Sequence, residues 1–455
     1  MKRLLLSLFL ALLLSTAAGT EQPEPEQPEP IEQPEPEQPE PIEQPELLLK
    51  TFPPDAQLYA GGRLLAPGAR FTGPDGGDWR RYTLRPGYQV LTLRADGYTS
   101  KWLHIRGNGT LRVDEKLERL DVPLRPRGEI ATGAHPKGVS FAPDGRTLVV
   151  TTLSDNGIDL YRAEPLEHLS RVELPPGGGD EEGFVEARFL PKRRELWVSQ
   201  MSTDEVHLLS TVDYRYITTI PTGGRWPKVM VSDPEERWLF VSNWHDQNIG
   251  VIDLDQRRLL RTIEVPGVPR GMVVSPDGRS LYVALFEGGD LIHVEISDST
   301  YPTRRIEVGD GALRHLVMSE DGERIYISDM YYGSILLFDV RREVVVGRRR
   351  LGYNINTIDL SPGEEYLLVS ERGRNNPGDY RKKGPQFGRI FLCDPVTLER
   401  VSWIWGRNQP TGLDISPDGR YLAFTDFMDD NLELYEFAPR SRTAETKRLP
   451  RSNSF

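Results

Sequence analysis

Hydrophobic and polar residues alternate in short runs throughout residues 128–437, and turns near Pro-Asp-Gly separate the runs. Four of these segments read VSFAPDGRTLVVTT, VVSPDGRSLYVAL, VMSEDGERIYISD and DISPDGRYLAFTD. A period of two between apolar positions predicts half-buried β-strands, and Gly next to Asp or Pro predicts the turns between them. Each unit holds an apolar strand, a turn, a Tyr-Val-like strand, a polar loop and two further strands. The pattern therefore predicts four strands per unit.

The unit occurs seven times, and one anchor residue at each turn marks its position. The anchors are Pro143, Pro191, Pro234, Pro276, Glu320, Pro362 and Pro417. Successive anchors lie 48, 43, 42, 44, 42 and 55 residues apart. A period in the low forties with four strands per repeat indicates the blades of a β-propeller. We expect an all-β chain with a seven-bladed β-propeller over residues 125–438. Such a scaffold carries function in its loops, so the repeat alone leaves the activity open.

The phase of the repeat also predicts how the propeller closes. The last repeat stops at residues 431–437, which correspond to the third strand of a blade. Residues 127–132, RGEIAT, align with the fourth strands at 262–265 and 305–308. We therefore expect residues 127–132 to complete the last blade and remove its open sheet edge.

Composition changes sharply before the propeller. Residues 1–20 have a basic start, an apolar centre and a small-residue end, which is typical of a secretory signal peptide. A retained membrane anchor is the alternative, but the apolar centre is short for a bilayer. Residues 21–46 repeat Glu, Gln and Pro and predict an extended, disordered spacer. Residues 47–124 alternate strand-like runs with turns and predict a small β-rich module, and residues 439–455 form a basic tail that we expect to be flexible.

Four short motifs in the small β-rich segment resemble those of the PEGA domain, a β-sandwich of exported and cell-surface bacterial proteins. They are Pro53-Pro54-Asp55-Ala56, Gly61-Gly62, Leu84-Arg85-Pro86-Gly87 and Asp96-Gly97-Tyr98. The chain departs from the family at Asp55, where the family has Gly. The resemblance implies a role in the cell envelope, with attachment as the expected task, and it brings no catalytic residues.

The propeller repeat resembles the YVTN family of seven-bladed propellers. The matching stretches are residues 281–284, 325–328 and 239–243. The second repeat departs most, because PKRREL replaces the Pro-Asp-Gly turn at Pro191. The resemblance implies the fold and says little about function.

The formal net charge of −12 is concentrated in the spacer. Lys2 and Arg3 contribute +2 and the ten Glu residues of 21–46 contribute −10, which leaves −4 for residues 47–455. A nearly neutral folded part makes nucleic acid an unexpected partner. The single cysteine, Cys393, cannot form an internal disulfide, and we expect it to be a buried apolar side chain.

A set of cations recurs six residues before the anchors, where the innermost strand of each blade begins. The seven residues are Lys137, Val185, Lys228, Arg270, Arg314, Asn356 and Thr411. We expect them to ring one end of the central channel, the end opposite the Pro-Asp-Gly turns. Four cations that converge repel one another unless a negative group lies among them. Lys137, Lys228, Arg270 and Arg314 could therefore bind a polar or anionic small ligand, since Arg makes bidentate contacts to carboxylate or phosphate.

Polar and acidic residues recur nine residues after the anchors. They are Thr152, Gln200, Asn243, Leu285, Asp329, Glu371 and Asp426. Two alternatives to the ligand pocket follow from them. The acids could neutralise the cations across the channel mouth. Asn243, Asp329, Glu371 and Asp426 could instead hold Ca²⁺ or another divalent cation, as in lactone-hydrolysing propellers, which the chain resembles only in fold.

Further candidates lie on the loops at the same end of the channel. Aromatic and polar residues there are typical of protein or glycan recognition, and they include Trp244, His245, His315 and Tyr331. The long anchor spacing comes from a basic insertion, residues 372–388, that contains Arg372 and Arg374. Long loops on rigid scaffolds are often functional, so we expect a lid, a partner-binding arm or a solvated insertion.

The motifs of common enzyme classes are missing from the sequence, which contains no HExxH, GxSxG, Walker loop or CxxC pair. We therefore expect an exported, periplasmic or surface protein of the bacterial envelope that binds rather than catalyses. Its expected partner is an envelope protein, a glycan or a small anionic ligand, with no cofactor. A metal-dependent hydrolase is the alternative.

Overall fold

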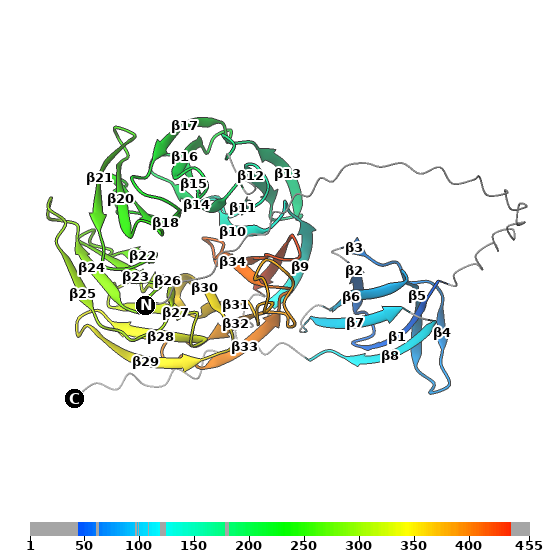
Figure 1. Ribbon diagram of the computed structural model, residues 1–455. Coiled ribbons are helices and arrows are strands. Elements are labelled where there is room, and N and C mark those ends of the chain that lie inside the picture. Colours follow the sequence, from blue (N-terminus) through cyan, green and yellow to red (C-terminus); the bar gives the residue numbers. More distant parts are fainter. Residues whose placement is uncertain are drawn as a thin grey trace, which may run out of the picture. The chain divides into compact units, whose positions relative to one another are not determined.

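The computed structural model describes residues 44–60, 63–95, 98, 100–107, 109–118, 124–177 and 182–437 (Figure 1). The predicted signal peptide, the spacer up to residue 43 and the predicted tail at 439–455 lie outside the described residues, as do the motif residues Gly61-Gly62 and Asp96-Gly97. In the described ranges the chain forms β-strands and one 3₁₀ turn, η1 (Pro362–Glu364). None of the helical structure in these ranges is long and apolar enough to cross a membrane.

Eight strands form the N-terminal module. They are β1 (Glu46–Phe52), β2 (Gln57–Ala60), β3 (Arg63–Leu64), β4 (Arg70–Thr72), β5 (Asp78–Thr83), β6 (Gly87–Arg94), β7 (Lys101–Gly107) and β8 (Thr110–Lys116). One sheet has the order β4-β5-β1-β8, and the other has the order β3-β2-β6-β7. The pairing is antiparallel except between β1 and β8, which run parallel. The module therefore consists of two four-stranded sheets.

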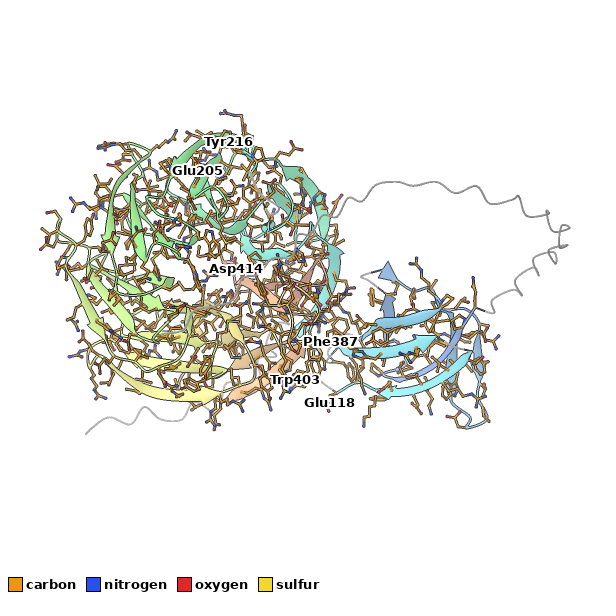
Figure 2. All side chains as sticks on the ribbon, in the orientation of Figure 1. Glu118, Glu205, Tyr216, Phe387, Trp403 and Asp414 are labelled. Atoms are coloured by element: carbon orange, nitrogen blue, oxygen red, sulfur yellow. The ribbon has the colours of Figure 1, made fainter. Side chains whose placement is uncertain are left out.

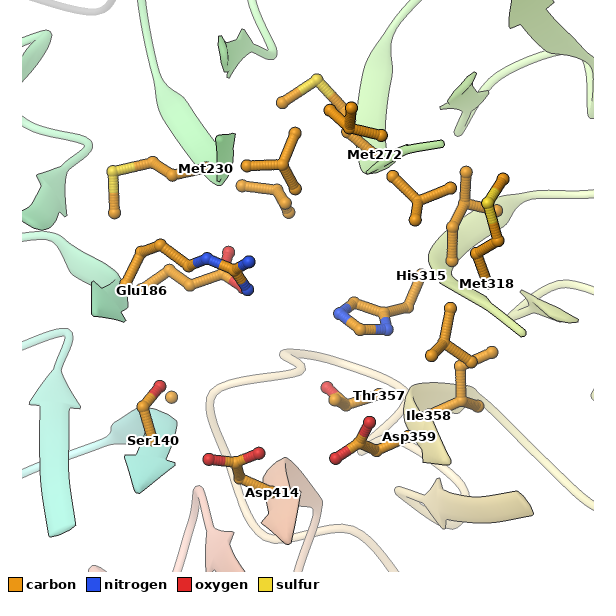
Figure 3. A pocket seen from close by; sticks show the side chains of 18 of the residues that line it. Ser140, Glu186, Met230, Met272, His315, Met318, Thr357, Ile358, Asp359 and Asp414 are labelled. Atoms are coloured by element: carbon orange, nitrogen blue, oxygen red, sulfur yellow. The ribbon is translucent and has the colours of Figure 1, made fainter. Parts of the chain in front are cut away.

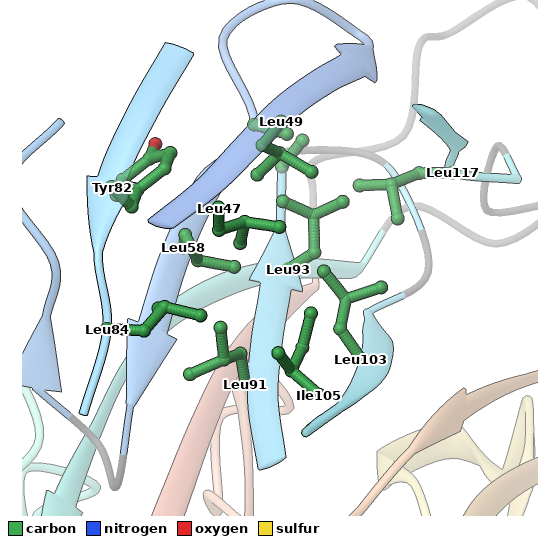
Figure 4. Close-up of a cluster of buried hydrophobic side chains, with 12 residues drawn as sticks. Leu47, Leu49, Leu58, Tyr82, Leu84, Leu91, Leu93, Leu103, Ile105 and Leu117 are labelled. Atoms are coloured by element: carbon green, nitrogen blue, oxygen red, sulfur yellow. The ribbon is translucent and has the colours of Figure 1, made fainter. Parts of the chain in front are cut away.

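A leucine-rich core joins the two sheets face to face (Figure 4). Leu47 and Leu49 come from β1 in the first sheet, and Leu58, Leu91 and Leu93 come from β2 and β6 in the second. All five are fully buried, and burial of each such side chain stabilises the fold by about 1.5–3 kcal/mol. The alternation that marks these segments in the sequence thus produces a small β-sandwich.

The propeller contains the remaining strands. Blade 1 consists of β10 (Pro136–Phe141), β11 (Thr147–Thr152), β12 (Ile158–Arg162) and β13 (Glu167–Val172). Blade 2 consists of β14 (Phe184–Leu190), β15 (Glu195–Gln200), β16 (Glu205–Ser210) and β17 (Tyr216–Pro221). Blade 3 consists of β18 (Pro227–Ser232), β19 (Trp238–Asn243), β20 (Asn248–Asp253) and β21 (Arg258–Glu264). Blades 4 and 5 are β22 (Pro269–Val274), β23 (Ser280–Leu285), β24 (Leu291–Glu295), β25 (Thr303–Ile306); and β26 (Leu313–Met318), β27 (Arg324–Asp329), β28 (Ser334–Asp339), β29 (Val344–Arg350). Blades 6 and 7 are β30 (Ile355–Leu360), β31 (Leu367–Glu371), β32 (Arg389–Cys393), β33 (Arg400–Trp405); and β34 (Pro410–Ile415), β35 (Tyr421–Asp426), β36 (Asn431–Phe437), completed by β9 (Leu124–Ala131).

The seventh blade unites the two ends of the propeller. Strand β9 pairs antiparallel with β36, with Ile130 opposite Leu432 and Leu124 opposite Phe437. The strand that sequence phase places at 127–132 is thus observed as part of β9, and the sheet order of the blade is β34-β35-β36-β9. The all-β prediction and the seven-bladed propeller are confirmed.

The blades are held together by apolar side chains packed between neighbouring sheets. One cluster joins Phe240 and Val251 of blade 3 to Met272, Leu281 and Val283 of blade 4. The first strand of each blade faces the centre of the ring and the fourth lies at its rim. In Figure 2, Asp414 of β34 lies towards the centre, whereas Tyr216 of β17 lies at the rim. Cys393 is fully buried, and burial raises the pKa of its thiol to about 12.

Candidate functional site

The centre of the propeller contains a cavity of about 610 Å³ (Figure 3). Its wall is made by the first strands of the seven blades, β10, β14, β18, β22, β26, β30 and β34. It extends from the level of Lys137 and Arg314 to the turns that contain Pro276 and Glu320. Pockets for small ligands span about 300–1,000 Å³, so the cavity has the size of a binding site.

A β-bulge interrupts every first strand at one shared position, six residues before the anchor. In β10, Pro136 lies opposite Thr152 while Gly138 lies opposite Thr151, so Lys137 has no partner residue. The same shift occurs in the other six blades. Bulges re-aim side chains, and this one turns a residue of each blade towards the channel mouth. The cations that the sequence places at this position share this conformation.

Hydroxyl groups eight residues after the anchor hold most of these bulges. The residues are Thr151, Ser199, Ser242, Ser328, Ser370 and Thr425, and blade 4 has Ala284 instead. Ser242 shows the arrangement: its hydroxyl oxygen accepts the Val229 N–H at 3.0 Å and donates to the Arg270 carbonyl of the next blade at 3.1 Å. Ser199 donates in the same way to the Lys228 carbonyl at 3.0 Å. These hydroxyls position the backbone of the cationic residues.

The structure brings the predicted cations together. Lys137, Arg270 and Arg314 lie on the cavity wall, and the two arginines are only 8% and 9% exposed. The pKa of Lys137 lies well below its usual range because the ammonium is buried and because Arg372, Arg314, Lys228 and Arg270 repel it. Burial and the charges of Arg270 and Arg372 lower the pKa of Arg314 in the same way. The charges of four other cations therefore act on Lys137 at this end of the channel.

In the described part of the chain, little negative charge lies beside Lys137, Arg270, Arg314 and Arg372. Among the described residues, Nη1 of Arg270 has no hydrogen-bond partner although the side chain is buried. The Arg372 guanidinium donates to the Gln409 side-chain carbonyl, and its pKa falls to about 10 because it is buried. Lys137 and Arg372 both lie over the ring of Phe427, at 4.7 and 5.6 Å from its centre. A neutral amide and an aromatic ring replace the counter-ion that buried cations usually have.

Glu186 is the carboxyl group that faces the cations most directly. It lines the cavity, and the charges of Arg270, Arg188 and Arg314 favour its ionised form. Burial outweighs them and raises the pKa of Glu186 to about 7. Glu186 therefore carries only part of a negative charge near neutral pH, and it cannot neutralise the cluster.

The acids that the sequence places nine residues after the anchors bind elsewhere, so they do not neutralise the cations. Asp329, Glu371 and Asp426 accept backbone N–H groups of the loop that enters their own blade, at 3.1, 2.8 and 2.7 Å. Asn243 donates to the Thr222 carbonyl at 3.1 Å. The end of the second strand turns these side chains towards the loop backbone instead of the channel.

The same arrangement separates the proposed metal ligands. Within the described ranges, no three His, Cys, Asp or Glu side chains lie close enough together to hold one ion. Glu371 forms its ion pair with Arg389, at 2.6 and 3.0 Å, and Asp329 lies 3.6 Å from Arg348. The metal alternative stays a prediction. In this structure Asn243, Asp329, Glu371 and Asp426 form their contacts within their own blades and the loops that lead into them.

The other predicted site residues fall into two groups. His315 lines the cavity, its Nδ1 atom has no hydrogen-bond partner among the described residues, and burial with the nearby arginines lowers its pKa to about 3. Trp244 lies beside the cluster, with the Lys228 ammonium 5.9 Å from its ring. His245 and Tyr331 lie on the surface, where Tyr331 is 74% exposed.

The insertion contributes one cation to the site and keeps the other away from it. Arg372, at the start of the insertion, is 4% exposed, and its charge helps to lower the pKa of Lys137. Arg374 donates to the Tyr353 hydroxyl at 2.6 Å on the surface instead. The segment is tied to the propeller through Gly373, whose carbonyl accepts from Asn354 at 2.7 Å, and Gly384, whose N–H donates to Asn408 at 2.6 Å.

A second polar layer lies deeper in the cavity, three residues before the anchors. Arg188, Asp359 and Asp414 occupy this position in blades 2, 6 and 7, and all three line the cavity. Burial raises the pKa of Asp359 to about 6, and burial together with the charge of the nearby Asp359 carboxyl raises that of Asp414 well above its usual range. This layer is not among the predicted site residues, although the sequence does place polar residues at this shared position of the repeat.

Comparisons with known proteins show strong similarity to one curated protein. The chain is 34% identical over 356 residues to antigen Lp49 of Leptospira interrogans serogroup Icterohaemorrhagiae serovar copenhageni (strain Fiocruz L1-130), and the match covers 76% of this chain and 77% of that protein. It is 30% identical over 114 residues to the seven-bladed beta-propeller protein Rv1057 of Mycobacterium tuberculosis (strain ATCC 25618 / H37Rv), which covers 24% of this chain and 29% of that one. No protein-family model matches the chain.

A solved structure supports the fold. Hydrazine synthase of Kuenenia stuttgartiensis superposes with a TM-score of 0.56 and 18% identity, and the match covers 68% of this chain and 97% of that one. At this level of identity the likeness concerns the fold alone.

Proposed function

Because this chain belongs to the same protein family as antigen Lp49 of Leptospira interrogans, we propose that it is an exported binding protein whose propeller channel takes a small anionic ligand. The name of the relative describes an antigen, and an antigen is often exposed on its cell. The predicted signal peptide at residues 1–20 favours export as well. The function we infer is therefore recognition in the cell envelope and not catalysis.

The observation that carries the proposal is the uncompensated charge at the channel mouth. Lys137, Arg270, Arg314 and Arg372 lie together, with burial and mutual repulsion lowering the pKa of Lys137 and of Arg314. A fold gains nothing in stability from such a cluster, since each buried charge costs several kcal/mol without a partner. A bound carboxylate or phosphate would supply that partner and form charge-assisted hydrogen bonds with the arginines.

The remaining parts of the chain fit a protein held at a distance from an anchoring structure. We assign the β-sandwich of residues 47–124 to the PEGA type, with attachment as its task, and the propeller to the YVTN type. A spacer rich in Glu and Pro would hold the folded part of the chain away from the place where its N-terminus sits.

A binding measurement with defined probes tests the proposal. Inorganic phosphate and N-acetyltriglycine, which carries one carboxylate, are titrated into the full chain by calorimetry at low salt. The double variant Arg270→Gln/Arg314→Gln removes two channel cations. Arg279→Gln is the matched control, because it removes one positive charge from the exposed turn of the same blade as Arg270.

We expect the parent chain and Arg279→Gln to bind at least one probe and the double variant to lose at least tenfold in affinity. Binding of neither probe by the parent chain would overturn the anion pocket. Equal affinity in the double variant would place the binding outside the channel and overturn the proposal as well.

A further inference from the structure

We propose that the ligand is bipolar, with an anionic group at the channel cations and a primary ammonium group at Asp359 and Asp414, as in a short peptide with free ends. The inference rests on the proposed function, because it takes the anion pocket as one end of the ligand. It adds to that function a binding site for the ammonium group, formed by the carboxyl groups of Asp359 and Asp414.

The two layers lie at different depths of one cavity. The cations stand six residues before the anchors and the acid pair stands three residues before them, on strands that line the same cavity. Three residues of β-strand span about 10 Å. Figure 3 shows Asp359 and Asp414 side by side on the cavity wall, with Glu186 and His315 around the same space. The cavity thus has a cationic end and an end that holds a pair of carboxyl groups.

The acid pair is built to accept a donor. Each carboxyl group accepts a backbone N–H, Phe141 N–H to Asp414 at 2.6 Å and Leu360 N–H to Asp359 at 2.8 Å. Two adjacent buried carboxyls share a proton, because both cannot ionise together. An ammonium group can take the place of that proton and donate to both oxygens.

One charged group and two neutral polar residues lie near the acid pair. Arg188, from β14, is the charged group whose field favours the ionised form of both carboxyls, but its effect is smaller than that of burial. Ser140 and Thr357 are neutral polar residues near the pair in Figure 3. Glu186 and His315 stand five residues before their anchors, and the charges of Arg270 and Arg314 act on both.

At the cationic end of the cavity, a buried side chain has a hydrogen-bond donor that a ligand could bind. Arg270 lines the cavity, is 8% exposed and has an Nη1 atom with no hydrogen-bond partner among the described residues. An extended tripeptide spans at most about 10 Å between its ends, which matches the separation of the layers. We therefore take a free tripeptide as the chemical class and triglycine as its probe.

Three probes separate the ends of the ligand in calorimetric titrations of the full chain. Triglycine has both charges, N-acetyltriglycine lacks the ammonium, and triglycinamide lacks the carboxylate. We expect triglycine to bind at least tenfold more tightly than either derivative. In Asp414→Asn, triglycine and N-acetyltriglycine should bind with equal affinity, while N-acetyltriglycine keeps its parent affinity.

Proton linkage gives a readout that a purely structural role of the pair would not produce. Titration in buffers of different ionisation enthalpy should show proton uptake with N-acetyltriglycine, because an anion raises the pKa of Lys137. The ammonium end should displace the shared proton, so triglycine should take up fewer protons than N-acetyltriglycine. Asp414→Asn should remove this difference.

Each outcome bears on a different claim. If N-acetyltriglycine binds as tightly as triglycine and with the same proton uptake, the bipolar ligand is refuted and the anion pocket stands. If neither carboxylate probe binds but phosphate does, the inference is refuted and the anion pocket stands. If phosphate does not bind either, both the pocket and the inference fail. If triglycinamide binds as tightly as triglycine, the ammonium end alone recognises the ligand and the inference is refuted.

Discussion

Removal of one buried arginine should leave the ligand-free protein as stable as before or make it more stable. The perturbation is Arg372→Gln, at a guanidinium that is 4% exposed and donates to Gln409, a neutral group. Its matched control is Arg389→Gln in the same blade. Arg389 pairs with Glu371 at 2.6 and 3.0 Å, and Glu371 is 1% exposed.

The magnitudes follow from the burial and the partners of each charge. Burial lowers the pKa of Arg372 from 12.5 to about 10, and at 1.36 kcal/mol per unit the charged form is disfavoured by about 3 kcal/mol. Loss of the bond to Gln409 and of the contact with Phe427 costs about 1–2 kcal/mol. The net expectation is a gain of about 1–2 kcal/mol. Arg389→Gln leaves the Glu371 carboxylate buried without its cation, which should cost about 3 kcal/mol.

The assay is equilibrium unfolding of the full chain in urea, which does not screen charges. The urea midpoint should rise or stay level for Arg372→Gln and fall clearly for Arg389→Gln. Saturating N-acetyltriglycine, at 100 times its dissociation constant, should stabilise the parent by about 2.7 kcal/mol and reverse its order with Arg372→Gln. A loss of stability in Arg372→Gln as large as that in Arg389→Gln would refute the reasoning, because it would mean that Arg372 is compensated in the folded state.

Three further perturbations test other parts of the account. The pKa of Lys137 is lower in the folded state than in the unfolded chain. The parent should therefore gain stability relative to Lys137→Met as the pH rises through the folded-state pKa towards 10.5. A difference in urea midpoint that does not change with pH would contradict this expectation. The pKa of Glu186 is raised to about 7, so the parent should lose stability relative to Glu186→Gln as the pH rises from about 4.5 to 7. The same urea unfolding series measures this loss. A difference in urea midpoint that is constant over this pH range would show that Glu186 ionises normally. Ser242→Ala should cost about 1–2 kcal/mol and weaken phosphate binding, since it frees the Arg270 carbonyl, whereas Ala284→Ser, in the one blade without the hydroxyl, should not weaken it.

The periodicity of the sequence is sufficient to predict the fold and the positions of the cations. Apolar residues with a period of two, and turns spaced by a constant distance, specify strands and blades because each blade must bury the same two faces. The position six residues before the anchor is a bulge in all seven blades, so counting along the repeat locates Lys137 and Arg314 together. Because the same bulge recurs in each blade around the channel, the residues at this position form a ring.

Other parts of the site depend on contacts that a repeat does not encode. The acids at Asp329 and Glu371 share a sequence position with one another, but the end of their strand directs them to loop N–H groups. Arg372 belongs to an insertion without counterparts in other blades, so no phase assigns it to the cluster. The hydroxyl series at Ser242 was visible in the sequence, yet its role required the geometry of two adjacent blades.

The central claim is that the channel mouth holds cations without a counter-ion, and the ionisation of Lys137 reports on it directly. Reductive methylation with ¹³C-formaldehyde gives each lysine an NMR signal, and the signal missing in Lys137→Arg identifies Lys137. We predict a pKa well below 10.5 in the ligand-free protein and a clear rise when phosphate or N-acetyltriglycine is added. A pKa near 10.5 that neither anion changes would contradict the account.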